Sequence, residues 1–202
     1  MSEARTYHPP RTLAPWGDIV PDAGPMTVEK LLALPDDGWR YEVVEGMLIR
    51  VAGSGLRATT VARRLGARLG DFVDDHGLGF VSTADGVYRF PGAETGLLPD
   101  VGFIYASRRA LIVDVDKPIP FAPDLAVEVA SPSQSQGDMD AKARQYLDGG
   151  TSLVWIIWPL RQEVDVWHPH DNTPTTLSAA DRLDGEQVVP GFSHPIAPLL
   201  VV

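Results

Sequence analysis

Cysteine is absent from this chain of 202 residues, and other features that define classes of protein are missing as well. Without cysteine the chain forms no disulfide, no thiolate zinc site and no cysteine nucleophile. No apolar run approaches the roughly 20 residues that a membrane-spanning helix needs. The first residues lack the apolar core of a signal peptide. We therefore expect a cytoplasmic protein that does not associate with membranes.

Positive charge is also scarce. Lys and Arg number 17 against 27 Asp and Glu, and the net charge is −10. This balance argues against broad, non-specific binding of nucleic acid, which requires a basic surface. It leaves room for a local basic groove or for metal ions. One conspicuous basic cluster lies along a predicted helix, and it is either a solvated face or a phosphate-facing surface: Arg57, Arg63, Arg64 and Arg68.

The length and an ordinary composition, with 44% hydrophobic and 22% charged residues, favour one globular domain. Residues 1–25 are rich in proline and predict an extended arm that packs on the body or on a second subunit. Residues 26–202 contain no repeat and no linker, so we assign them to a single domain. Symmetric dimers are common among soluble proteins, and we expect a homodimer.

Apolar spacing predicts a mixed α/β fold. Thr27 is the expected cap of a short helix over 27–34, and two strands follow with a turn at Glu45–Gly46. A long helix over 58–74 has its apolar stripe at Val61, Leu65, Leu69 and Phe72. Later elements are two strands over 80–90 and 97–106 joined at Pro91–Gly92, an irregular segment over 107–123, a strand over 164–167 and a hairpin around 183–185.

Residues 123–158 contain the most informative stretch: a strand, a polar loop, a helix and another strand. Glu128 lies inside the first strand, where Leu125, Val127 and Val129 alternate with two alanines. A strand that is apolar on both faces is covered on both sides, and a carboxylate there is unusual. Burying an isolated carboxylate costs several kcal/mol, so a cation, a metal ion or a donor must meet Glu128.

Asp100 lies near the start of the preceding predicted strand. If the two strands pair, Asp100 and Glu128 converge on one place. Two carboxylates with a backbone carbonyl and waters suit Mg²⁺ or Mn²⁺, which prefer oxygen ligands. The alternatives are an ordinary ion pair and, for Asp100, a turn residue after Pro99.

The following helix carries Asp138, Lys142 and Tyr146 four residues apart, with Gln145 beside them, so that they share one face. If this helix packs back on the sheet, Lys142 reaches the two carboxylates and lies near a scissile phosphate or an attacking water. The alternative is a surface pair of Asp138 and Lys142, which contributes a few tenths of a kcal/mol. His168 and His170 are a weaker metal-binding candidate, because a strand-end loop explains them as well.

The motifs P-D-V at 99–101 and E-V-A at 128–130, with the helical lysine, resemble the PD-(D/E)XK superfamily of metal-dependent nucleases. More specifically, five blocks resemble the Uma-type "putative restriction endonuclease" family, in that family's order over about residues 26 to 193. They are T-V-E-K-L-L-A-L-P-D-D-G-W-R-Y-E-V-V-E-G, P-D-L-A-V-E-V-A-S-P-S, D-M-D-A-K-A-R-Q-Y, V-W-I-I-W-P and V-P-G-F.

The resemblance implies a restriction-endonuclease-like α/β core of αβββαβ type with additional N-terminal and C-terminal strands. It implies Asp100, Glu128 and the carbonyl of Val129 as metal ligands. Glu42 matches a further acidic position, with Glu45 as the competing choice. The superfamily's lysine position holds Ala130 here, and the resemblance implies that Lys142 takes over its role. Arg57 stands where relatives carry a histidine.

Our leading hypothesis is a Mg²⁺-dependent endonuclease, with Mn²⁺ as a possible substitute, that hydrolyses phosphodiester bonds in DNA. Asp100 and Glu128 hold the metal ion, Lys142 orients or polarises the attacking water, and Glu42, Tyr146 and Gln145 support the site. Two alternatives remain. One is a non-catalytic nuclease-fold module that binds a partner protein, and the other is a phosphoesterase for small substrates.

Overall fold

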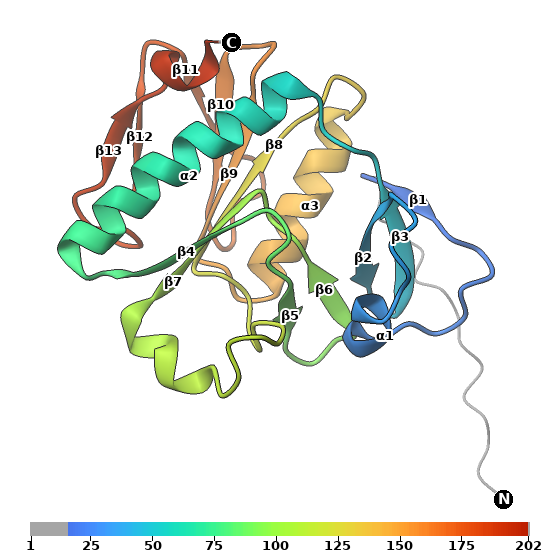
Figure 1. Ribbon diagram of the computed structural model, residues 1–202. Coiled ribbons are helices and arrows are strands. Elements are labelled where there is room, and N and C mark those ends of the chain that lie inside the picture. The colour runs from blue at the N-terminus through green and yellow to red at the C-terminus, as the bar shows by residue number, and fades with distance from the viewer. Residues whose placement is uncertain (1–15, 202) are drawn as a thin grey trace, which may run out of the picture.

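The computed structural model describes residues 16–201 (Figure 1). The expected arm falls largely on residues 1–15, which lie outside the described residues. From residue 16 onward, the remainder of the arm is tied to the body. Trp16 is buried, and β1 (Asp18–Ile19) pairs with a strand of one sheet.

A six-stranded sheet forms the centre of the fold, in the order β11–β10–β9–β8–β7–β4. Its strands are β4 (Gly79–Thr83), β7 (Val101–Tyr105), β8 (Leu125–Val129), β9 (Leu153–Trp158), β10 (Glu163–Trp167) and β11 (Thr175–Ser178). β8 and β9 are parallel and the other pairs are antiparallel. A parallel pair requires a crossover connection, and the helix after β8 provides it.

A second sheet has the order β1–β3–β2–β6–β5. Its remaining strands are β2 (Arg40–Val44), β3 (Met47–Val51), β5 (Tyr88–Phe90) and β6 (Thr95–Leu97). The predicted turn between β2 and β3 is confirmed, with Glu45 and Gly46 both at positive φ (49° and 77°). Near the C-terminus, β12 (Arg182–Asp184) pairs with β13 (Ser193–Pro195), so the expected hairpin closes through a long loop after β12.

Four α-helices and one 3₁₀ helix complete the described part of the chain: α1 (Val28–Leu32), α2 (Leu56–His76), η1 (Ala106–Leu111), α3 (Gln136–Asp148) and α4 (Ala197–Leu200). Thr27 caps α1 by accepting a hydrogen bond from the Lys30 N–H, as predicted. Ser135 and Asp138 form a reciprocal capping box at the start of α3, which explains why the helix begins there. None of these helices has the length and apolar character needed to cross a membrane.

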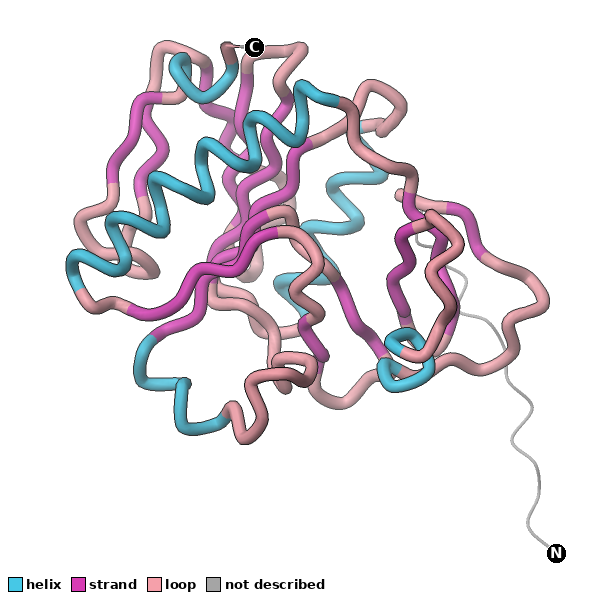
Figure 2. Tube along the Cα trace, viewed as in Figure 1, coloured by secondary structure: helices cyan, strands magenta, loops and turns pink. Residues whose placement is uncertain are grey.

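Helices α2 and α3 lie on opposite sides of the six-stranded sheet (Figures 1 and 2). Each face of the sheet carries its own apolar core. On one face, Leu125, Val127 and Val129 of β8 pack with the buried stripe of α2 and with the C-terminal segment. On the other, Ala126 and Ala130 pack with α3 and with residues of the five-stranded sheet. Glu128 alternates onto this second face, which is the side of α3.

The chain order α2, β4, β7, β8, α3 and β9 is the expected αβββαβ core, with β10 and β11 added to the same sheet. Two expectations were wrong. The first part of the segment over 107–123, which was expected to be irregular, forms the 3₁₀ helix η1. The runs over 80–90 and 97–106 are four strands instead of two. The first run breaks at Asp85 (φ 85°) and Gly86, and the second breaks at Pro99. β4 and β7 therefore join the large sheet, while β5 and β6 form a hairpin in the other.

Gly149, at the C-terminal cap of α3, sets the distance between α3 and β5. Its backbone angles suit any residue (φ −78°, ψ −5°), but a Cβ there would overlap the ring of Phe90. We expect Gly149→Ala to lower the free energy of unfolding by about 1–3 kcal/mol through overpacking. The matched control is Gly137→Ala in the first turn of α3, where the nearest atom is Ser135 Oγ at 3.9 Å. Removing that glycine should stabilise by about 0.5–1 kcal/mol. Urea unfolding of both variants tests the contrast, and equal effects would contradict it.

Candidate active site

Four ionisable side chains from three elements meet where the two sheets adjoin. They are Glu42 of β2, Asp100 just before β7, Glu128 of β8 and Lys142 of α3. All four line one small cavity of about 30 Å³. Glu42, Glu128 and Lys142 are buried, with 3%, 5% and 3% of their surface exposed, and Asp100 is half-buried.

The pairing of β7 with β8 brings Asp100 and Glu128 together. Val101 pairs with Val127, so one further step in this antiparallel register places Asp100 opposite Glu128. A hydrogen bond of 2.8 Å from the Val129 N–H to Asp100 Oδ2 holds the aspartate in place. The convergence that the sequence suggested is therefore present in the structure.

Lys142 lies inside this cluster and not at the surface. Its ammonium Nζ is 3.0 Å from Glu128 Oε1 and 3.1 Å from Glu42 Oε1. The proposed partner in a surface pair, Asp138, is occupied by the capping box instead. One turn further along α3, the Tyr146 hydroxyl donates to Glu128 Oε1 at 2.6 Å.

Glu42 holds Lys142 and is itself fully occupied. Its Oε1 accepts from the Leu98 N–H at 3.1 Å, and its Oε2 accepts from Trp16 Nε1 at 2.8 Å. Glu45, the competing choice, lies exposed at the turn between β2 and β3 and takes no part in the cluster. Because both oxygens of Glu42 have partners, this residue positions Lys142 and is not a candidate metal ligand.

The cluster holds three carboxylates and one ammonium, and its pKa values shift accordingly. Burial raises the pKa of Glu128 to about 7, even though Lys142 opposes the rise. Burial also raises the pKa of Asp100, against the hydrogen bond from Val129. Burial alone would lower the pKa of Lys142, but the charges of Glu128 and Glu42 hold it above its ordinary value. With the guanidinium of Arg40, which lines the same cavity, three carboxylates face two cationic side chains, and this leaves room for a further cation.

The donor set fits Mg²⁺. Within the described residues, Asp100 Oδ1 and Glu128 Oε2 make no hydrogen bond, while their partner oxygens are occupied. Mg²⁺ is usually bound by one or two carboxylates and keeps several waters. The cavity of about 30 Å³ has space for a small ion, since roughly 10–15 Å³ is enough for one water. Residues 16–201 bring no three His, Asp or Glu side chains together as a metal site of their own, so backbone oxygens or waters would complete the coordination of a bound ion.

Two residues that take part in this region, Arg40 and Trp16, were not predicted from the sequence. Arg40 lines the same cavity from β2 and exerts a favourable charge on Asp100. Arg40 lies two residues before Glu42 in the same strand, so the two side chains share a face. This spacing could have predicted that Arg40 lies near Glu42. Trp16 had no such signal, because it reaches Glu42 from a distant part of the chain. Gln145 is half-buried on α3 and makes no side-chain hydrogen bond within the described segment.

The arginines of α2 do not act as one group. Arg57, Arg63 and Arg68 are exposed, but Arg64 donates to the carbonyl oxygens of Leu199 and Val201 and so fastens the C-terminal segment. Arg57 does not line the acidic cavity. A continuous phosphate-facing stripe along α2 is therefore not formed.

His168 lies in the loop after β10 and is held by two carboxylates. Its Nδ1 is 3.1 Å from Asp171 and its Nε2 is 2.9 Å from Glu186. Partial burial by itself would lower the pKa of His168, but the bonds and charges of Glu186 and Asp171 outweigh it and raise the pKa. This contact explains the histidine without a metal ion.

Because the pKa of His168 is higher in the folded than in the unfolded protein, its protonation stabilises the fold. This stabilisation is complete below the pKa of the unfolded state, about 6.5, and is lost as the pH rises through the pKa of the folded state. We expect His168→Gln to destabilise most at pH 6 and to lose this effect by pH 8.5. The difference should stay below about 1 kcal/mol, because the groups are partly exposed. Urea unfolding across this pH range measures it. His194→Gln is the control, since its ring contacts the Pro195 carbonyl instead of a carboxylate. A pH-independent difference for His168 would contradict the prediction.

The αβββαβ core with an acidic pair at the start of β7 and near the end of β8 defines a restriction-endonuclease-like fold. Residues 28–199 match the model of the Uma2 family, described as "putative restriction endonuclease", and the chain belongs to that family. A solved structure of a "putative nuclease belonging to DUF820" from Anabaena variabilis superposes with a TM-score of 0.73 at 20% identity, covering 87% of this chain and 98% of that one. This likeness supports the fold. A comparison with curated proteins gave no match.

Proposed function

We propose that this protein is a Mg²⁺-dependent endonuclease that hydrolyses phosphodiester bonds in DNA. One observation carries the proposal. A buried lysine is held 3.0 Å from Glu128, in a cavity onto which the half-buried Asp100 also faces. The match to the "putative restriction endonuclease" family supports the nuclease class. The family match specifies neither the metal ion nor the substrate, and we infer both from the site.

Each side chain has a distinct task in this proposal. Asp100 and Glu128 provide the ligand oxygens, together with the carbonyl of Val129. Mg²⁺, when bound, would lower the pKa of water and stabilise charge on a phosphoryl oxygen. Lys142 orients the attacking water and offers its ammonium to the phosphate. Tyr146 fixes Glu128, and burial and the charge of Glu128 hold the pKa of its hydroxyl well above the ordinary value, so that it remains a donor. Glu42 keeps Lys142 in place.

Hydrolysis of the phosphodiester consumes one water molecule. The water oxygen bonds to phosphorus and gives up a proton to solvent, the bond from phosphorus to the leaving oxygen breaks, and the leaving oxygen takes up a proton from solvent. Most of the catalytic effect comes from positioning and charge stabilisation, which buried and preorganised groups supply best.

Metal removal tests the proposal directly. Purified protein is expected to cut DNA with Mg²⁺ or Mn²⁺ and to stop when EDTA is added. Calorimetric titration with Mn²⁺ should detect one site, which Glu128→Gln removes. The variant Asp165→Asn, which alters a buried carboxylate outside the cavity, should retain the site. No Mn²⁺ binding and no cleavage would instead favour a non-catalytic module that binds a partner protein.

We also propose that two copies associate. The segment around the end of η1 carries apolar side chains that are unusually open to solvent, with Leu111, Val113 and Val115 exposed by 58%, 97% and 66%. Clustered apolar exposure is typical of interaction surfaces. This observation supports the homodimer that the sequence led us to expect.

A further inference from the structure

A second and much larger cavity adjoins the acidic one. It has a volume of about 440 Å³ and lies between α2 and β4. We call it the α2–β4 groove. Its walls are formed mainly by Ala62, Gly66, Ala67 and Gly70 of α2 and by Val81 and Thr83 of β4. Asp100 and Arg40 line both this groove and the acidic cavity, so the two spaces meet at the proposed metal ligand.

Small side chains keep the groove open. Within residues 16–201, a Cβ at Gly70 would have no atom within 4 Å, so the described part of the chain leaves this position open. At Gly66 a Cβ would meet Thr83 and Val101 at 3.4 and 3.5 Å, which is ordinary packing contact. The groove is thus apolar, has a closed floor and lies within the range of about 300–1,000 Å³ that is typical of small-ligand sites.

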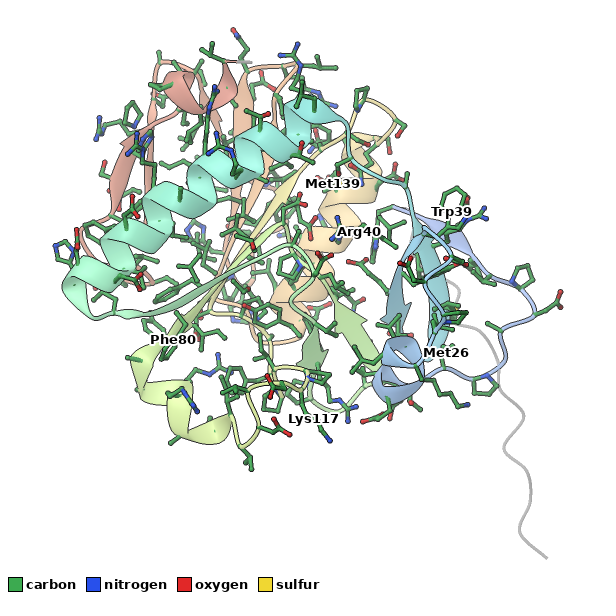
Figure 3. All side chains as sticks on the ribbon, in the orientation of Figure 1. Met26, Trp39, Arg40, Phe80, Lys117 and Met139 are labelled. Atoms are coloured by element: carbon green, nitrogen blue, oxygen red, sulfur yellow. The ribbon has the colours of Figure 1, made fainter. Side chains whose placement is uncertain are left out.

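Two arginines provide positive charge along this groove. Arg63 projects from α2 and is exposed, and Arg40 lies between the two sheets (Figure 3). The guanidinium of Arg40 is 3.6 Å from Asp85, whose side chain is 84% exposed. Such an exposed pair contributes at most about 1 kcal/mol, so Arg40 can exchange it for a phosphate. Among the residues that line the groove, these two arginines outnumber its one carboxylate, Asp100, on a protein whose net charge is −10.

A base has to leave its stack and its pair to enter a groove of this size. An enzyme that takes a base into a pocket either acts on a single strand or extrudes the base from the duplex. Affinity for a regular duplex comes from many phosphate contacts, and of the α2 arginines only Arg63 lines the groove within the described residues. The apolar space instead fits one nucleoside, and the two arginines beside it fit the phosphates on either side of that nucleoside.

We propose that the α2–β4 groove binds one unpaired nucleoside next to the scissile phosphate, with Arg40 and Arg63 on the neighbouring phosphates. The substrate is therefore single-stranded or locally unpaired DNA. This inference rests on the proposed function, because it assigns the position of the strand that Asp100 and Glu128 would cut.

The test uses a single-stranded oligonucleotide that the native protein cuts, its duplex form, and a set in which each residue in turn is replaced by an abasic one. We expect the single strand to be cut at least tenfold faster than the duplex. One abasic position next to the cut should lower cleavage at least tenfold, and positions further away should have little effect.

Two variants link that effect to the groove. Ala67→Leu fills the groove from an exposed helical position with a good helix former. It should reduce cleavage at least tenfold and abolish the sensitivity to the abasic position. Arg63→Ala should raise KM, whereas Arg68→Ala, an exposed arginine of α2 outside the groove, should not.

The possible outcomes separate the two proposals. Cleavage that ignores every abasic position, or that prefers the duplex, would overturn the groove assignment while leaving the nuclease proposal intact. Failure to cut any DNA in the presence of Mg²⁺ or Mn²⁺ would overturn both. Equal effects of Arg63→Ala and Arg68→Ala would remove Arg63 from the site.

Discussion

Asp100→Asn is expected to reduce DNA cleavage by at least 100-fold while leaving the protein as stable as the native form or more stable. Asn keeps an acceptor oxygen for the Val129 N–H, so the hydrogen bond of 2.8 Å can persist. The substitution also removes one negative charge from a cluster of three carboxylates and one ammonium. Burial already raises the pKa of Asp100, which shows that the charged form is costly in this place.

Loss of activity combined with retained stability is typical of a residue kept for function. A carboxylate that serves as a metal ligand destabilises the folded protein when no cation is bound. The measurements are cleavage rate in Mg²⁺ and urea unfolding without metal. The matched control is Asp124→Asn. Asp124 is also a carboxylate directly before a strand of the large sheet and is more deeply buried than Asp100, but it pairs with Arg108 at 2.6 Å and accepts from the Tyr105 N–H at 2.9 Å.

Asp124→Asn should therefore lower stability and retain cleavage, the reverse of Asp100→Asn. If Asp100→Asn cut DNA at the native rate, Asp100 could not be a metal ligand. If it unfolded as readily as Asp124→Asn, its role would be structural.

Lys142→Met is expected to lower the free energy of unfolding by about 3–5 kcal/mol, which is the usual cost of removing one partner from a buried ion pair. The ammonium lies between Glu42 and Glu128 at 3.1 and 3.0 Å. Without it, two buried carboxylates face each other uncompensated. Cleavage should also be lost, because the water and the phosphate lose their cationic partner.

A double-mutant cycle isolates this effect. Lys142→Met combined with Glu128→Gln should recover much of the lost stability but no activity, since the charge is relieved and the metal ligand is gone. Lys117→Met is the control, because Lys117 is an exposed lysine on a loop (Figure 3). A loss of less than about 1 kcal/mol for Lys142→Met would mean that the buried pair is not charged as described.

Local patterns predicted most of the elements. Thr27 as a cap, the Glu45–Gly46 turn and the apolar stripe of α2 depend on neighbours within a few residues. The cap and the turn are confirmed. The stripe is confirmed at Val61, Leu65 and Leu69, but Val73 is buried at its end while Phe72 is only partly buried. The split of the 80–90 and 97–106 runs was missed, because breaks at Gly86 and Pro99 resemble small irregularities within a strand. Only the pairing of each half with a different sheet reveals four strands.

Part of the candidate site could also be predicted. Alternation in β8 isolates Glu128, and the spacing of four residues aligns Lys142 with Tyr146, since both follow from the period of one element. The resemblance to a nuclease family then pointed to Asp100 and Glu42. Trp16 was missed, because it reaches Glu42 from a segment 26 residues earlier in the chain. Arg40 was missed although it shares a face of β2 with Glu42, because only the packing of the two sheets turns that face toward the cavity.

The amino-acid sequence by itself determined the order of elements, the two apolar faces of β8 and the presence of a carboxylate that needs a cation. These features follow from backbone sterics and from the cost of burying charge, which act within single elements. Only the tertiary structure decided which cation meets Glu128, that Glu42 and not Glu45 joins it, and that a groove of about 440 Å³ opens beside Asp100. Those outcomes depend on how separate elements pack, and contacts between residues far apart in the chain leave no periodic signal in it.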